Sequence, residues 1–290
     1  MLAGLLLGLG AGASAHPLDA RIWDTRTSTF IDAPRAYDLA DRARYVLLGE
    51  RHDNPAHQQL QLAMLAALDA RGRDPALAME QFDSEHQAAL DAAREARIRN
   101  PERLADAGRL DREGWRWPSY KPLVEYAARS AWPIVAANLS RAAAREIALG
   151  HARPALPPAD AAQQAALEAD IVDGHCGHRL PPAMLARIVA AQRARDQRMA
   201  AVLDETSADP VVLIAGAGHV RRDRAVPRYL ARPDAALTIA YVETRPGTTD
   251  PADYDAAGYD LLWFTPAVER PDPCVEPIVG KLFGAAQNTR

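Results

Sequence analysis

Short runs of continuous apolar residues recur along the chain and alternate with longer stretches of helical periodicity. The apolar runs are Tyr45–Leu48, Ala76–Met79, Ile134–Ala137, Val211–Ala215, Leu237–Val242 and Leu261–Phe264. Continuous rather than alternating hydrophobicity is typical of strands that are covered on both faces. The helical patterns lie over Ala56–Ala70, Glu85–Arg99, Pro122–Ser130, Arg141–Leu149, Ala159–Val172 and Pro182–Glu205. We therefore predict an α/β fold with a mostly parallel central sheet flanked by helices.

The longest helical stretch falls between two predicted strands. We expect it to form a helical insertion, at about residues 159–206, that caps the carboxyl edge of the sheet. The length of 290 residues and a hydrophobic content of 48% suffice for a large core, as one domain or two smaller ones. The formal net charge of −4 and the lack of a basic stripe give no support to nucleic acid as a partner.

The amino-terminal residues resemble an export signal. Leu2–Ala13 is apolar and leads to Ala13-Ser14-Ala15, a small-residue cleavage pattern, so we predict a signal peptide over residues 1–15. The alternative is a buried amino-terminal helix. No cysteine follows the run, which excludes a lipid anchor there, and we expect a periplasmic or secreted protein. Cys176 and Cys274 suit that compartment either as a disulfide or as two separate thiols.

Polar residues stand directly after several of the predicted strands. In chain order they are Glu50 and His52, Glu80, Asn138, His219 and Glu243. The carboxyl ends of parallel strands share one edge of the sheet, and ligands of open α/β sheets bind at that edge. The sequence therefore predicts that these side chains converge on one site.

Two Gly-x-x-His units, Gly49–His52 and Gly216–His219, each end an apolar run. Glycine permits a sharp turn and keeps side-chain bulk away from a ligand. His52 and His219, together with Glu50 and Glu80, could ligate a divalent metal, because mixed nitrogen and oxygen ligands are typical of hydrolytic sites. A second interpretation makes one histidine a general base oriented by a carboxylate. In the purely structural interpretation, His52 caps the next helix and His219 is an ordinary loop residue.

Other residues near these strand ends could contact a bound ligand. Glu80 ends an apolar run, where a carboxylate is costly to bury unless it is paired, and Arg195 is the alternative structural partner. In the aromatic patch Trp115–Tyr120, Trp117 could pack against a flat hydrophobic ligand, and Tyr120 could offer a phenolate to ferric iron. The alternative is a tryptophan-rich packing layer. The predicted ligand contacts are Tyr120, Trp117, Asn138 and Arg195.

Several blocks of sequence, taken together, resemble one known family. The blocks are LLGERHDNPAHQQLQ, LAMEQF, VAANLSR, HCGHRLP, AQRARDQRMA and GAGHVRRDRAVPRYL. They are similar to the ChaN-like haem-binding uptake family of the Tiki/TraB and erythromycin-esterase superfamily, in the same order, from about His16 to Thr265. The resemblance implies a single ChaN-like haem-binding α/β domain over residues 16–290 and an exported protein of iron or haem acquisition.

The wider superfamily implies a second function. It includes metal-dependent peptidases with paired Gly-x-x-His motifs, and esterases in which the histidine of Gly-Glu-x-x-His is the base. Carried onto this chain, the catalytic roles fall on Glu50, His52, Glu80 and His219. The esterase spacing differs here, because one residue and not two separates Glu50 from His52, which puts ester cleavage in doubt.

We expect non-covalent haem binding, because the chain has no Cys-x-x-Cys-His motif for covalent attachment. The alternative is a metal-dependent hydrolase in which His52, Glu80 and His219 bind Mn, Co or Zn and activate water. The expected partners are haem as a small-molecule ligand, an outer-membrane haem receptor or transport proteins, and a second copy of the chain in a homodimer.

Overall fold

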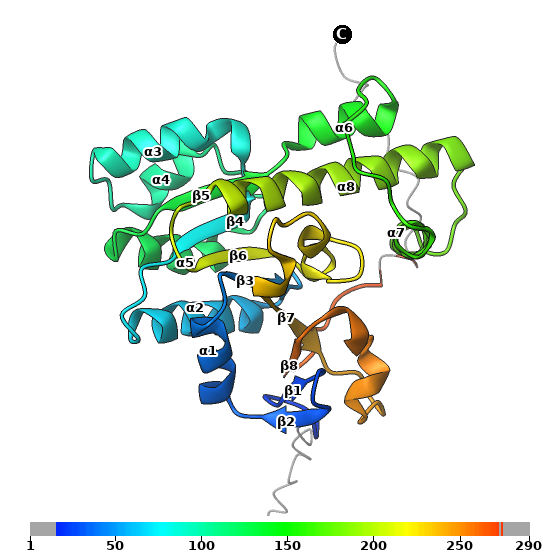
Figure 1. The fold of residues 1–290 in the computed structure, drawn as a ribbon, viewed down its shortest axis with the longest axis horizontal. Coiled ribbons are helices and arrows are strands. Elements are labelled where there is room, and N and C mark those ends of the chain that lie inside the picture. Colours follow the sequence, from blue (N-terminus) through cyan, green and yellow to red (C-terminus); the bar gives the residue numbers. More distant parts are fainter. Residues whose placement is uncertain (1–15, 273, 275–290) are drawn as a thin grey trace, which may run out of the picture.

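The computed structural model describes residues 16–272 and residue 274, and these form one eight-stranded sheet with helices on both faces (Figure 1). The strand order is β2-β1-β8-β7-β3-β6-β4-β5. Strands β3 to β8 are parallel, whereas β1 is antiparallel to β2 and β8. The strands are β1 Ile22–Asp24, β2 Thr29–Ile31, β3 Tyr45–Glu50, β4 Ala76–Asp83, β5 Ile134–Asn138, β6 Val211–Gly216, β7 Ala236–Glu243 and β8 Leu261–Thr265. The predicted α/β fold with a mostly parallel sheet is confirmed.

The helices are α1 Ala33–Asp41, α2 Pro55–Asp69, α3 Gln87–Glu95, α4 Pro101–Ala107, α5 Trp117–Arg129, α6 Arg141–Leu149, α7 Ala161–Gly174 and α8 Pro182–Glu205. Each predicted strand corresponds to one of β3 to β8, and each predicted helical segment corresponds to a helix. The short elements β1, β2, α1 and α4 were not predicted. The predicted signal peptide lies outside the described residues.

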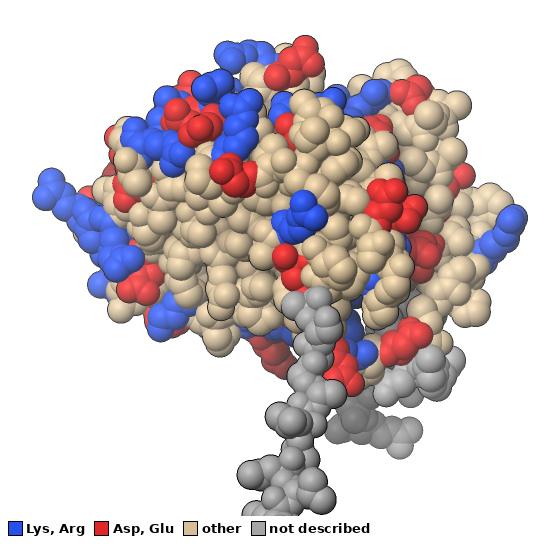
Figure 2. Space-filling model, turned by 90° about the horizontal axis from the view of Figure 1, so that it is seen from below, with Lys and Arg blue, Asp and Glu red and all other residues tan. Residues whose placement is uncertain are grey.

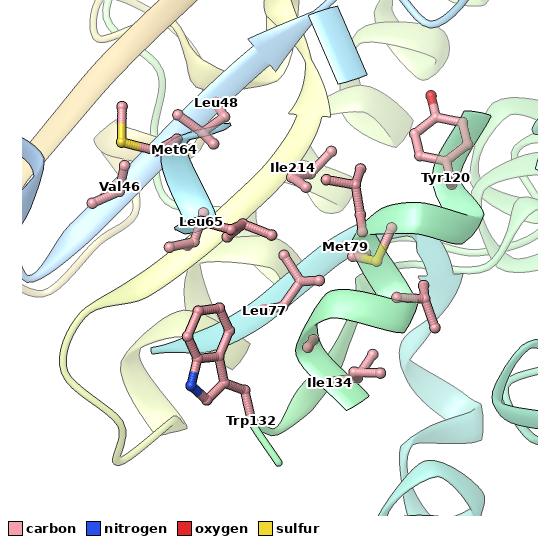
Figure 3. Packing of buried hydrophobic residues seen from close by; sticks show 14 of the residues in the cluster. Val46, Leu48, Met64, Leu65, Leu77, Met79, Tyr120, Trp132, Ile134 and Ile214 are labelled. Carbon is pink, nitrogen blue, oxygen red and sulfur yellow. The ribbon is translucent and has the colours of Figure 1, made fainter. Parts of the chain in front are cut away.

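Both faces of the sheet are buried, which explains the continuous hydrophobicity of its strands. On one face, Val46, Leu48 and Ile214 pack against α2 and α5, and Figure 3 shows this cluster with Met64 and Leu65. Successive side chains of a strand point to opposite faces. Accordingly, Leu47 and Leu213 belong to a second cluster on the other face, which contains Met199 and Leu203 of α8.

Helix α8 has two roles along its length. Its carboxyl-terminal half contributes Met199 and Leu203 to the second core cluster. One turn before these residues, Arg195 and Asp196 reach side chains at the carboxyl ends of the strands. Helices α7 and α8 together make up the predicted insertion, and α8 joins the core to the site.

Cys176, just after α7, forms a disulfide with Cys274, with their Cα atoms 5.5 Å apart. The sequence left this pairing open, and the structure decides it in favour of a disulfide. None of the described helices is long and apolar enough to cross a bilayer. On the face shown in Figure 2, blue and red side chains are interspersed among uncharged ones, without a continuous basic stripe.

Candidate functional site

The polar residues gather where the chain connections reverse direction. Strand β3 connects through α2 to β4, which lies beyond β6, whereas β6 connects to β7 on the other side of β3. Ligands of open α/β sheets bind in the crevice at such a reversal. Glu50 and Gly216 end the two strands concerned, and Glu80 lies in the neighbouring β4.

Glu50 is a buried carboxylate that holds one half of the site together. Its Oε1 accepts a hydrogen bond from Nδ1 of His52 at 2.9 Å. Its Oε2 accepts from Nε2 of Gln58 and of Gln61, each at 2.8 Å, and the hydroxyl of Tyr120 donates to Oε1. Glu50 is only 2% exposed. Because hydrogen bonds to a charged group offset its loss of hydration, these donors fix the carboxylate in place.

Tyr120 belongs to the support of the site and does not face its open space. It is fully buried on α5. Burial, the nearby Glu50 charge and the hydrogen bond to Glu50 all raise the pKa of the Tyr120 hydroxyl far above its ordinary value. The Tyr120 hydroxyl is buried and donates to Glu50 in this arrangement, so its role as a phenolate ligand of ferric iron stays a prediction.

Of the neighbouring tryptophans, Trp115 and not Trp117 reaches the site. Trp117 is 5% exposed, packs in the core, and donates from Nε1 to Oε2 of Glu102 at 2.8 Å. The ring of Trp115 meets His52 edge to face, with centroids 5.0 Å apart. The predicted ligand contact of Trp117 is therefore not seen, and Trp115 takes that place.

His52 is the most accessible of the convergent side chains, with 42% of its side chain exposed. Its Nε2 lies 3.9 Å from Oε2 of Glu80. A Cβ at Gly216 would stand 3.0 Å from this Nε2, so glycine there leaves room for the imidazole. Burial alone would lower the pKa of His52, but the Glu50 hydrogen bond and the charges of Glu80 and Glu50 raise it above the usual value.

The second half of the site is an ion-pair network around Glu80. Its Oε1 lies 2.5 Å from Nη2 of Arg195 and 3.4 Å from Nε2 of His219, and its Oε2 accepts from the Gly216 amide at 2.7 Å. His219 Nδ1 lies 2.5 Å from Oδ1 of Asp196. Arg195 also donates from Nε to Oδ1 of Asn138 at 3.1 Å.

The charges of this network follow from its geometry. Burial alone would raise the pKa of Glu80, but His219 and Arg195 hold it well below its usual range. Burial alone would lower the pKa of His219, but Glu80 and Asp196 raise it to about 9. At neutral pH, Glu80 is therefore an anion and His219 a cation.

These residues do not fit the predicted divalent metal. The nitrogens of His219 already face Asp196 and Glu80, and both oxygens of Glu80 already accept hydrogen bonds. Among the residues that the structure describes, no group of three or more His, Cys, Asp or Glu side chains is arranged to hold a metal ion. The predicted ligands His52, Glu80 and His219 thus lie together, but the structure gives no support to bound Mn, Co or Zn.

Two hollows adjoin at His52. The larger, which we call the main cleft, has a volume of about 740 Å³ and lies over the ends of β3, β6 and β7. Its walls include Arg51, Val242, Tyr254 and Tyr259. The smaller, which we call the side chamber, has about 400 Å³ and lies over the ends of β4 and β5, with Trp115, Asn138 and Arg195 in its lining.

Sequence reasoning missed part of the support of the site. Gln58 and Gln61 lie three residues apart on one side of α2, and buried polar residues at that spacing in an apolar helix were a usable signal. Asp196 was not among the predicted site residues. Nothing in the sequence indicated that it pairs with His219, because that contact depends on how α8 crosses the sheet.

Comparison with known proteins gives one family match. The model of the family described as haem-binding uptake, Tiki superfamily, ChaN, matches residues 37–230. No curated protein matches the chain.

Among solved structures, ChaN of Campylobacter jejuni shares this fold, and its structure is described as showing cofacial heme binding. It is 24% identical, the alignment covers 85% of this chain and 96% of that one, and the TM-score is 0.72. The type III effector HopBA1, at 14% identity, covers 80% of this chain and 92% of its own, with a TM-score of 0.44. An erythromycin esterase mutant in its open conformation, at 13% identity, covers 83% and 95%, with a TM-score of 0.45.

Proposed function

Since this chain belongs to the haem-binding uptake family of the Tiki superfamily that includes ChaN, we propose that it is an exported protein that binds haem non-covalently and reversibly for iron or haem uptake. The observation that carries the proposal is the main cleft at the carboxyl edge, which His52 borders. Its volume of about 740 Å³ lies within the range of about 300 to 1,000 Å³ that is usual for sites of small molecules and cofactors.

The walls of the main cleft suit the chemistry of haem, a flat apolar ring that carries two carboxylates. Tyr254 and Tyr259 offer aromatic surface, and Val242 adds an aliphatic one. Arg51 stands beside His52 with 57% of its side chain exposed. A guanidinium recognises a carboxylate through paired hydrogen bonds, so we assign Arg51 to the propionates of haem.

His52 is the residue that we expect to contact the haem face. Its Nδ1 is held by Glu50 at 2.9 Å, which leaves Nε2 on the side of the ring away from this carboxylate. A carboxylate that accepts from one imidazole nitrogen orients the ring and makes the other nitrogen a better ligand or hydrogen-bond partner. Trp115 packs edge to face on the same ring and restricts its rotation.

Export is supported by two observations. Residues 1–15 have the composition of a signal peptide. The Cys176–Cys274 disulfide suits an oxidising compartment. Sequencing the protein from a periplasmic or culture fraction should give His16 as its first residue, and thiol titration should find cysteines only after reduction. Protein that retains Met1 and two reactive thiols would contradict export.

Hemin titration tests the binding proposal. Purified apo-protein should develop a Soret band that saturates at a fixed stoichiometry. His52→Ala should lower hemin affinity at least tenfold, about 1.4 kcal/mol. The matched control is His151→Ala, because His151 is 64% exposed and lies at neither hollow. A spectrum like that of hemin adsorbed on albumin, unchanged by His52→Ala, would defeat the proposal.

A delivery partner and a homodimer stay predictions. The same titration, followed by sedimentation, should show whether hemin changes the oligomeric state.

Acid extraction with an organic solvent should remove all haem from the complex, because both cysteines are in the disulfide and none is left for a covalent bond. Haem that stays with the protein would contradict non-covalent binding.

A further inference from the structure

A separate cavity lies at the opposite edge of the sheet from the proposed haem site. It has a volume of about 350 Å³ and lies beside the first residue of β5, Ile134, whereas Asn138 at the other end of that strand lines the side chamber. Helices α3 and α4 lie beside β5 in Figure 1 and provide one wall. We call this hollow the amino-edge cavity.

The floor of the amino-edge cavity is apolar. Leu90, Leu104, Trp132 and Ile134 line it and are each less than 10% exposed, and Ile98 adds a half-buried side chain. Figure 3 shows Trp132 and Ile134 at this end of the core cluster. Removing an apolar group from water is favourable in proportion to its area, so this floor would accept a hydrocarbon chain.

The rim of the amino-edge cavity is cationic. Arg94, Arg97 and Arg99 line it, with Glu95 as the single lining carboxylate. Arg99 donates to the carbonyl of Arg129 at 2.8 Å and so belongs partly to the end of α5. For Arg94 and Arg97, no hydrogen bond or ion pair within the described part of the chain competes for the guanidinium.

The ring of Trp132 belongs to this apolar floor. Its indole N–H is buried, and among the described residues it has no hydrogen-bond partner. This nitrogen has no open surface, so a ligand in the cavity would meet the ring and not the N–H. An apolar floor and a rim of guanidinium groups together match one class of molecule.

We propose that the amino-edge cavity is a second ligand site, which binds an amphipathic carboxylate with its hydrocarbon chain on the floor and its head at Arg94 and Arg97. The cavity volume lies at the lower end of the usual range for small-molecule sites, so the ligand is a medium-length chain. The site is independent of haem, because its lining shares no residue with the main cleft or the side chamber.

Calorimetric titration with decanoate tests the proposal. Decanoate should bind with a stoichiometry of one, and 1-decanol and acetate, which each lack one half of the molecule, should bind at least tenfold more weakly. The double variant Arg94→Glu/Arg97→Glu should lower decanoate affinity at least tenfold. The matched control is Arg145→Glu on α6, an exposed arginine that lines none of these hollows.

Melting temperatures and hemin titrations of the same proteins complete the test. The rim variant should melt like the wild type and bind hemin with unchanged affinity, because its changes are on the surface and away from the main cleft. Ala128→Leu, which adds bulk to the cavity lining, should also weaken decanoate binding. Decanoate affinity that is equal in all variants, non-saturable binding, equal binding of 1-decanol, or displacement of decanoate by hemin would overturn the second site.

Discussion

At the scale of single residues, Glu50 is the centre of the site, because donors from the loop after β3 and from three further elements surround its buried carboxylate. His52 follows β3, Gln58 and Gln61 come from α2, Gln81 comes from β4, and Tyr120 comes from α5. Several donors fix the same carboxylate, so Glu50 continues to orient His52 when one of the other donors is removed. Mutation can therefore separate the contribution of these donors to protein stability from the role of His52 in binding.

Tyr120→Phe should destabilise the protein and leave hemin binding unchanged. The variant removes one hydrogen bond to a buried charge, which is usually worth about 1.5–3 kcal/mol. Denaturant unfolding gives the change in stability, and hemin titration should stay within twofold of the wild type. A loss of hemin affinity without a loss of stability would instead make Tyr120 an iron ligand, the role that the sequence suggested.

His219→Gln should reveal the charge of His219 through pH dependence. Its folded pKa of about 9 is above the ordinary value for histidine. Its contribution to stability is therefore complete below about pH 6.5 and is lost as the pH rises through about 9. The wild type should exceed the variant in unfolding free energy at pH 6, and the difference should shrink by on the order of 3 kcal/mol by pH 10. A difference that is independent of pH would contradict a cationic His219.

At the scale of elements, the glycine that precedes Glu50 lets β3 approach the turn after β6. A Cβ at Gly49 would lie 2.4 Å from Cγ2 of Val220 and 2.9 Å from Cα of Ala217. Because the second contact is with backbone, it cannot be relieved by a rotamer change. The close approach brings the two Gly-x-x-His motifs together.

Gly49→Ala should cost about 1–3 kcal/mol of stability, as overpacking in a core usually does. The matched control is Gly218→Ala in the second motif, where a Cβ would meet nothing within 4 Å, and its effect should be within about 0.5 kcal/mol. Urea unfolding measures both. Equal costs for the two substitutions would show that the close contact at Gly49 is unimportant.

The same elements show what the sequence could predict. Strands β3 to β8 were found because they are buried on both faces and therefore read as unbroken apolar runs. The hairpin of β1 and β2 was missed, because each strand has only three residues and β2 at the sheet edge is half exposed. Helix α4, with seven residues, is too short to show a clear period.

The site was predictable only as far as sheet topology determines it. Glu50, His52, Glu80 and His219 were expected to converge because parallel strands end at one edge, and the structure places them within one network of contacts. The start of α5 determines which aromatic side chain faces the site, and the sequence alone does not determine that start. Trp117 and Tyr120 were therefore expected at the site, where the structure places Trp115. The charge state of His219 depends on Glu80 and also on Asp196, which α8 brings from 23 residues away.

At the scale of the whole molecule, helical layers enclose the sheet, and α8 connects the core to its carboxyl edge. The disulfide joins the end of α7 to residue 274, a separation of 98 residues along the chain. The main cleft and the amino-edge cavity lie at opposite edges of this frame. The proposed haem site follows from the family, whereas the proposed second site rests on this chain alone.

The central claim is that haem occupies the main cleft beside His52, and crystals grown with hemin test it most directly. Anomalous differences measured at the iron absorption edge locate the metal without any assumption about its ligands. We predict an iron peak in the main cleft, with Arg51 at the propionates and His52 in contact with the haem. An iron peak at the amino-edge cavity, or on the surface away from both His52 and Arg51, would contradict it.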